Sequence, residues 1–184
     1  MNHSDNEKNR QAPRKWKHLD NFTLQNEREY VYRGEYMVCS VSAAEYRRNC
    51  MSMLLASALA SALLVVAGCF SDTGMEGNAF LLIPYALSLI EGLLLCWSLV
   101  SMLRYGPRLR KYQYEKTVYA AKRKMTGALL GTAAGSLSWI LSCLHGSGSV
   151  KGTGGVILRL SFMAGFACFL VSLILDRKLS WKKE

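Results

Sequence analysis

The sequence has little of the chemistry from which catalytic and metal sites are built. Its three histidines, His3, His18 and His145, have no nucleophile and acid at helical spacing. Its six cysteines show no Cys-x-x-Cys spacing and no histidine at metal-ligand distance. We therefore expect no catalytic residue, no metal site and no cofactor, and we predict that the protein is not an enzyme.

Charge is almost absent from four long apolar stretches, 51–70, 79–103, 125–144 and 153–175. The first and third contain no charged residue, the second contains only Glu91 and the fourth only Arg159. A helix that crosses a bilayer needs about 20 mostly apolar residues. Because soluble cores rarely show this pattern, we predict an all-α membrane protein, a four-transmembrane antiparallel helical bundle.

Basic residues are scarce in two short connections, 71–78 and 145–152, which contain only Lys151. Nine Lys or Arg precede the first stretch, eight lie within 104–124 and four follow residue 175. This distribution follows the positive-inside rule and predicts cytoplasmic N- and C-termini. We expect the plasma membrane of a bacterium and a lipid bilayer as partner. The net charge of +10 then sets topology, so we expect no nucleic-acid binding.

The N-terminal segment, 1–42, is predicted to be a short, partly disordered cytoplasmic tail. Alternating aromatic and aliphatic residues in 30–40 favour a short hairpin closed at Gly34. Ser42 and Glu45 have the spacing of a capping box. A helix is therefore expected to begin after Ser42 and to continue into the first span.

The remaining chain, 43–184, is predicted to form the transmembrane domain as two helical hairpins. Gly106-Pro107 should end the second span, and the basic cytoplasmic loop 104–124 should return to helix before Met125. Residues 54–61 resemble the residues 75 positions later. This similarity indicates either a parallel duplication of the two hairpins or a shared composition of small residues.

Three glycines in the third span, Gly127, Gly131 and Gly135, recur every four residues and mark one smooth helix face. Such faces permit close contact between membrane helices. Two interpretations remain open. Either helices of the same chain fill this groove, or it is an interface with another protein.

Glu91 and Arg159 are the charged residues within the predicted spans. An ionised group at the bilayer centre costs about 3 kcal/mol, so Glu91 needs a reason to be there. We expect it to be protonated and hydrogen-bonded to Thr132 or Ser136 of the third span. For Arg159, three roles remain open: an ion pair with Glu91, extension to the outer membrane interface, or a ligand contact.

Cys69 lies at the outer end of the first span and belongs to two patterns. Together with Cys143 it could form a disulfide in an oxidising compartment, although apolar packing explains both residues equally well. Val66-Ala67-Gly68-Cys69 also resembles a bacterial lipoprotein cleavage box. The apolar run is long and begins some fifty residues into the chain, which favours a retained helix.

These features favour a non-enzymatic function based on helix association. The leading hypothesis is an accessory or assembly subunit of a membrane complex, or a homo-oligomer. The alternative is a small proton- or cation-coupled transporter or channel that uses Glu91.

Overall fold

The structure is a computed structural model that describes residues 22–26, 29–32, 35–75, 78–144 and 152–184. Residues 1–21 of the predicted tail, the proposed hairpin tip at Gly34 and Lys151 lie outside these residues.

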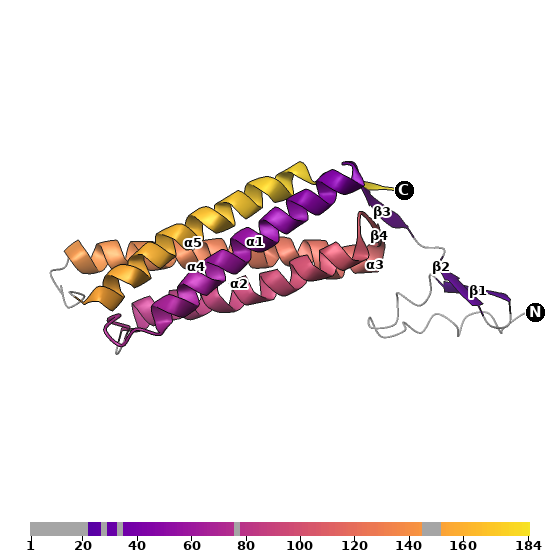
Figure 1. Cartoon of the computed structure of the whole chain (residues 1–184). Coiled ribbons are helices and arrows are strands. Elements are labelled where there is room, and N and C mark those ends of the chain that lie inside the picture. The colour runs from indigo at the N-terminus through magenta and orange to yellow at the C-terminus, as the bar shows by residue number, and fades with distance from the viewer. Residues whose placement is uncertain (1–21, 27–28, 33–34, 76–77, 145–151) are drawn as a thin grey trace, which may run out of the picture.

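Four long helices make up most of the chain (Figure 1). They are α1 (Ala43–Gly68), α2 (Ala79–Tyr105), α4 (Ala120–Leu144) and α5 (Thr153–Lys178). Each predicted span falls on one of them. Among the described helices, α1, α2 and α5 are long and apolar enough to cross a membrane.

The four helices form a ring in which α1 and α4 each pack against both α2 and α5. Consecutive helices run in opposite directions (Figure 1). Inside the ring, the fully buried side chains include Met53, Leu95, Leu99 and Phe169. The sequence therefore correctly predicted a largely helical protein with apolar helices of transmembrane length.

The bundle differs from a soluble one in what faces outward. Large apolar side chains such as Leu55 (65% exposed) and Leu130 (62% exposed) cover the outside. Small polar side chains lie inside, where Ser61 Oγ donates to the Ser57 carbonyl at 2.9 Å. This bond to the preceding helical turn satisfies the hydroxyl without water. Small interior residues and an apolar exterior are typical of membrane helices.

Two helix ends confirm the sequence-based predictions. Ser42 Oγ accepts a hydrogen bond from the Glu45 amide at 3.2 Å, which caps α1. Gly106 follows α2 with a φ of 79°, a conformation that glycine adopts without steric cost. The chain also returns to helix before Met125, because α4 begins at Ala120.

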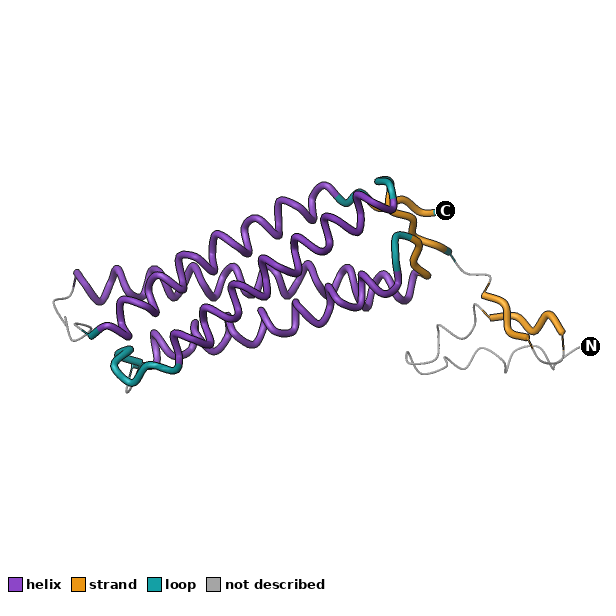
Figure 2. The backbone as a smooth tube through the Cα atoms, viewed as in Figure 1, coloured by secondary structure: helices purple, strands orange, loops and turns teal. Residues whose placement is uncertain are grey.

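A three-stranded antiparallel sheet at one end of the bundle was not predicted (Figure 2). It joins three segments that are distant in sequence, in the order β4-β3-β5. The strands are β3 (Tyr36–Cys39), β4 (Arg108–Arg110) and β5 (Trp181–Lys183). The short helices α3 (Lys111–Tyr114) and η1 (Glu115–Tyr119) connect β4 to α4. The all-α class was therefore too narrow.

The strands that the sequence suggested near Gly34 have other partners. The segment β2 (Glu29–Tyr32) pairs with β1 (Phe22–Asn26), whereas β3 pairs with β4 and β5. An isolated two-stranded hairpin is marginally stable in water. Because β3 has a partner on each side, it gains more backbone hydrogen bonds than the predicted hairpin offered. We call this end of the bundle the sheet end.

At the opposite end, the turn end, the connection after α1 caps α5. The Gly154 amide donates to Asp72 Oδ1 at 3.0 Å. A Cβ atom at Gly152 or Gly154 would overlap the Asp72 carboxyl group, so these glycines allow the close approach. A carboxylate at a helix N-terminus also interacts favourably with the helix dipole. Asp72 therefore links the two hairpins.

We expect Asp72→Ala to destabilise the folded protein by about 1 kcal/mol, because α5 loses its N-terminal cap. Thermal unfolding of the purified protein in mild detergent measures this effect. Ser71→Ala, at the neighbouring exposed position, is the matched control. Equal melting temperatures for Asp72→Ala and Ser71→Ala would show that the cap contributes nothing.

Candidate functional site

Glu91 lies near the middle of α2, at the seam where α2 packs against α4. Its side chain is partly exposed and covers Gly127. A Cβ atom at position 127 would lie 3.2 Å from Glu91 Cγ and 3.3 Å from Cδ. The absence of a side chain at Gly127 therefore leaves the space that the carboxyl group occupies.

The hydrogen bonds predicted for Glu91 are not formed. Thr132 Oγ1 donates to the Ala128 carbonyl at 3.0 Å, and Ser136 Oγ donates to the Thr132 carbonyl at 2.9 Å. Both hydroxyl groups therefore serve their own helix. Within the described part of the chain, no hydrogen bond or ion pair reaches the Glu91 carboxyl group.

Lys124, which no sequence pattern marked as a candidate, lies at the same seam. Its Nζ donates to Ser98 Oγ at 2.7 Å and to the Leu94 carbonyl at 3.2 Å. The side chain thus extends along α2 away from Glu91 and toward the sheet end. Long basic side chains near a helix end commonly extend toward that end. The position of Lys124 one residue before the third apolar stretch could therefore have predicted this contact.

The other two glycines of the predicted groove also contact helices of the same chain. A Cβ atom at Gly131 would lie 2.5 Å from Ser88 Oγ and 3.1 Å from the Ser88 backbone nitrogen. At Gly135 it would overlap the ring of Phe162 on α5. Within this chain, α2 and α5 therefore fill the glycine face.

Arg159 lies near the turn end of α5 and stacks on an aromatic ring. Its Cζ is 4.7 Å from the centroid of the Trp139 ring on α4. Arg159 and Trp139 line a small pocket together with Thr73 and Asn78. No ion pair between Glu91 and Arg159 occurs among the described residues. The structure therefore does not bring the two charged candidates together.

The predicted cysteine pair is only half described. Cys69 is exposed and is a free thiol, whereas the side chain of Cys143 lies outside the described residues. The disulfide and the processing of the Val66–Cys69 box stay predictions.

A group of ion pairs closes the sheet end. The Glu35 carboxylate binds both Lys111, at 3.1 Å, and Lys183. Arg108 pairs with Glu184 at 3.0 Å. These contacts join β3, the α2–α4 connection and the C-terminal strand. The hydrogen bond from Lys183, with a second from Lys111, lowers the pKa of Glu35 below its ordinary value of 4.5.

We expect Glu35→Gln to lower the melting temperature at pH 7 and to have a smaller effect near pH 3. A lowered carboxyl pKa means that the stabilisation is present above the unfolded value of 4.5. It is lost as the pH falls through the folded value. Glu115→Gln, at an exposed position, is the control. An equal effect of Glu35→Gln at both pH values would contradict this origin of the stabilisation.

The seam between α2 and α4 offers one unpaired carboxyl group rather than a reactive cluster. Among the described residues, no group of three or more His, Cys, Asp or Glu could hold a metal ion. Comparisons with protein-family models, with characterised proteins and with solved structures found no match. Glu91 and its surroundings are therefore the candidate functional site.

Proposed function

We propose that the protein is an integral membrane protein in which all four long helices span the bilayer. Helix α4 has 25 residues, close to the 26 or 27 of the three apolar helices. It packs between α2 and α5, and its outward Leu130, Leu137 and Ile140 are exposed. If α4 lay outside the membrane, it would be separated from α2 and α5, against which it packs. The sheet end, which holds most of the described basic residues, then faces the cytoplasm.

We further propose that the protein acts by association with another transmembrane segment, as an accessory subunit or as a homo-oligomer. The observation that carries this proposal is the unpaired carboxyl group of Glu91. A polar group without a partner in hydrocarbon costs several kcal/mol. A facing helix that supplies a basic side chain or a hydrogen-bond donor would remove this cost. The surrounding Leu87, Ile90 and Leu94 are 44 to 56% exposed and would pack against that helix.

The glycine face is not the surface that we assign to the partner. Its three members already contact Glu91, Ser88 and Phe162 within the chain. The partner surface is instead the outer side of the α2/α4 seam, with Glu91 as its polar centre. We call this surface the Glu91 face.

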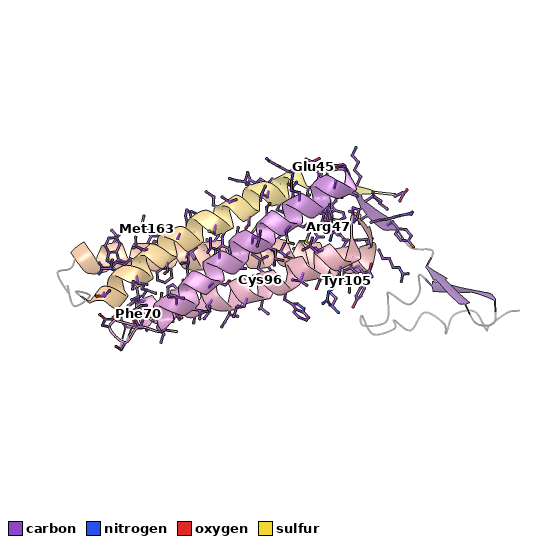
Figure 3. The ribbon with its side chains drawn as sticks, in the orientation of Figure 1. Glu45, Arg47, Phe70, Cys96, Tyr105 and Met163 are labelled. Atoms are coloured by element: carbon purple, nitrogen blue, oxygen red, sulfur yellow. The ribbon has the colours of Figure 1, made fainter. Side chains whose placement is uncertain are left out.

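Site-specific photo-crosslinking in intact membranes tests this assignment. A photoreactive residue at Leu94 or Leu130, 45% and 62% exposed, should crosslink to a protein partner or to a second copy. The control position is Met163, which is 60% exposed on α5 (Figure 3). We expect Glu91→Leu to abolish the crosslinks at both seam positions. Crosslinks to lipid alone at Leu94 and Leu130 would contradict association through the Glu91 face.

The second candidate function is a small proton- or cation-coupled transporter or channel. The same unpaired carboxyl group at the middle of α2 favours it. Large side chains such as Leu95, Leu99 and Phe169 fill the interior of the ring, so a pathway would have to lie between protomers. Proteoliposomes with wild-type protein would then show flux that Glu91→Gln abolishes. Equal flux from both proteins, or none from either, would remove this candidate.

A further inference from the structure

Two groups of basic side chains at the sheet end differ in their partners. The first group is neutralised within the chain by Glu35, Asp176 and Glu184, and its members are Arg108, Lys111, Lys122 and Lys183. The second group lies on the ends of the four long helices. Its six members are Arg47, Arg48, Arg104, Arg123, Arg177 and Lys178.

All six members of the second group are exposed, and none forms an ion pair with a described acidic residue. The other exposed acidic side chains on the helical elements of this end are Glu45 and Glu115. Six positive charges therefore face at most two negative ones. We call these six residues the basic collar.

Hydrogen bonds and an ion pair place the collar residues at one level of the bundle. Tyr46 Oη donates to the Met102 carbonyl at 3.0 Å, so the start of α1 lies beside the end of α2. Lys122 Nζ lies 3.4 Å from Asp176 Oδ2, which aligns the start of α4 with the end of α5. The Ser40 amide donates to the Ser180 carbonyl at 2.8 Å and joins the two pairs. Figure 3 shows Arg47 at the sheet end and Phe70 at the turn end.

The lengths of the helices place this level at the surface of a bilayer. Helix α1 has 26 residues, which correspond to about 39 Å at 1.5 Å per residue. The hydrocarbon core is about 30 Å thick. The surplus of about 9 Å is roughly six residues. Because every charged residue of α1 precedes Met51, this surplus lies at the sheet end and places Arg47 and Arg48 where phosphate groups are found. Below them, Met51 (48% exposed) and Leu55 (65% exposed) continue the outer face of α1, where acyl chains would lie.

We propose that the basic collar binds anionic phospholipid headgroups and gives the protein a shell enriched in anionic lipid. This inference rests on the proposed insertion of the bundle in a membrane, but not on association through the Glu91 face. A lipid supplies the phosphate charge that the chain itself does not supply. It also supplies acyl chains for the apolar surface directly below, which a free phosphate ion lacks.

Native mass spectrometry of the delipidated full chain in mild detergent tests the proposal. We expect phosphatidylglycerol to bind at least about tenfold tighter than phosphatidylcholine with the same acyl chains. Each basic residue near an anionic surface contributes about fivefold. Arg47→Gln/Arg48→Gln should therefore weaken phosphatidylglycerol binding about 25-fold and leave phosphatidylcholine binding unchanged. Arg47→Lys/Arg48→Lys keeps the charge and should retain the binding.

The matched control removes two basic residues that the chain already neutralises. Arg108→Gln/Lys183→Gln has the same change in net charge, and we expect less than about a twofold effect on phosphatidylglycerol binding. Arg104 and Arg123 belong to the same collar as Arg47 and Arg48. Arg104→Gln/Arg123→Gln should therefore weaken phosphatidylglycerol binding as much as Arg47→Gln/Arg48→Gln does. Reproduction of the loss also shows that it does not come from misfolding at a single site.

Three results would overturn the proposal: equal binding of the two lipids, an equal loss in the sheet control, or full competition by millimolar inorganic phosphate. A failure of the membrane proposal would look different, because the chain would then be recovered without membranes and would retain neither lipid. A chain recovered in membranes without preference for anionic lipid would overturn the collar alone.

Discussion

Gly131→Leu should prevent the bundle from forming a stable fold. A Cβ atom at this position would lie 2.5 Å from Ser88 Oγ and 3.1 Å from the Ser88 backbone nitrogen. The hydroxyl group can rotate away, but the backbone of α2 cannot, so the two helices must separate. Overpacking costs about 1 to 3 kcal/mol and occasionally more, and a clash with a helix backbone belongs at the upper end of this range. We expect a loss of the unfolding transition, or a strongly lowered melting temperature, in detergent-purified protein.

Ala134→Leu is the matched control, because Ala134 lies on the exposed side of the same helix. It adds the same side chain with no helix to displace. Similar melting temperatures for Gly131→Leu and Ala134→Leu would contradict the close contact between α2 and α4.

Trp181→Ala should detach the C-terminal strand and destabilise the sheet end by about 3 kcal/mol. The Trp181 ring lies edge-on to Tyr46 of α1, with 6.0 Å between centroids, and to Tyr114 of α3, at 5.3 Å. Leu109 of β4 is fully buried in the same cluster. Removal of the indole therefore loosens four elements at once. A lower melting temperature and faster proteolysis after Leu179 would be the readouts.

Trp97→Ala is the control for this substitution. Trp97 is 71% exposed on α2 and faces outward, so its loss should change the melting temperature little. A larger effect of Trp97→Ala than of Trp181→Ala would show that the cluster around Trp181 does not hold the sheet end together.

The sequence predicted the helices well because their signals are local. Apolar length identified α1, α2 and α5, and Ser42 and Gly106 are caps that act within one turn. The sheet could not be predicted in this way. Its strands have three or four residues each, and their pairing depends on the bundle bringing three distant segments together.

The candidate site was predicted only in part, because its charged residue and its glycine spacing are local features whereas its contacts depend on how the helices pack. The charge of Glu91 inside an apolar stretch is visible in the sequence, and so is the spacing of the glycines. Which residues each side chain contacts depends on how the helices are rotated about their axes, and the sequence pattern alone does not reveal this rotation. The serine and threonine hydroxyls were expected to bind Glu91, but hydroxyls in helices commonly bond the preceding turn, as Thr132 and Ser136 do.

We propose that the unpaired carboxyl group of Glu91 holds the protein to another membrane segment. The most direct test is the mass of the complex extracted from membranes in mild detergent, measured for wild type, Glu91→Gln and Glu91→Leu. We predict an assembly larger than one chain for wild type and a single chain for Glu91→Leu. Glu91→Gln should retain at least part of the assembly, because its amide oxygen still accepts a hydrogen bond from the donor of the partner. A wild-type protein that is extracted as a single chain with no other protein bound would contradict the claim.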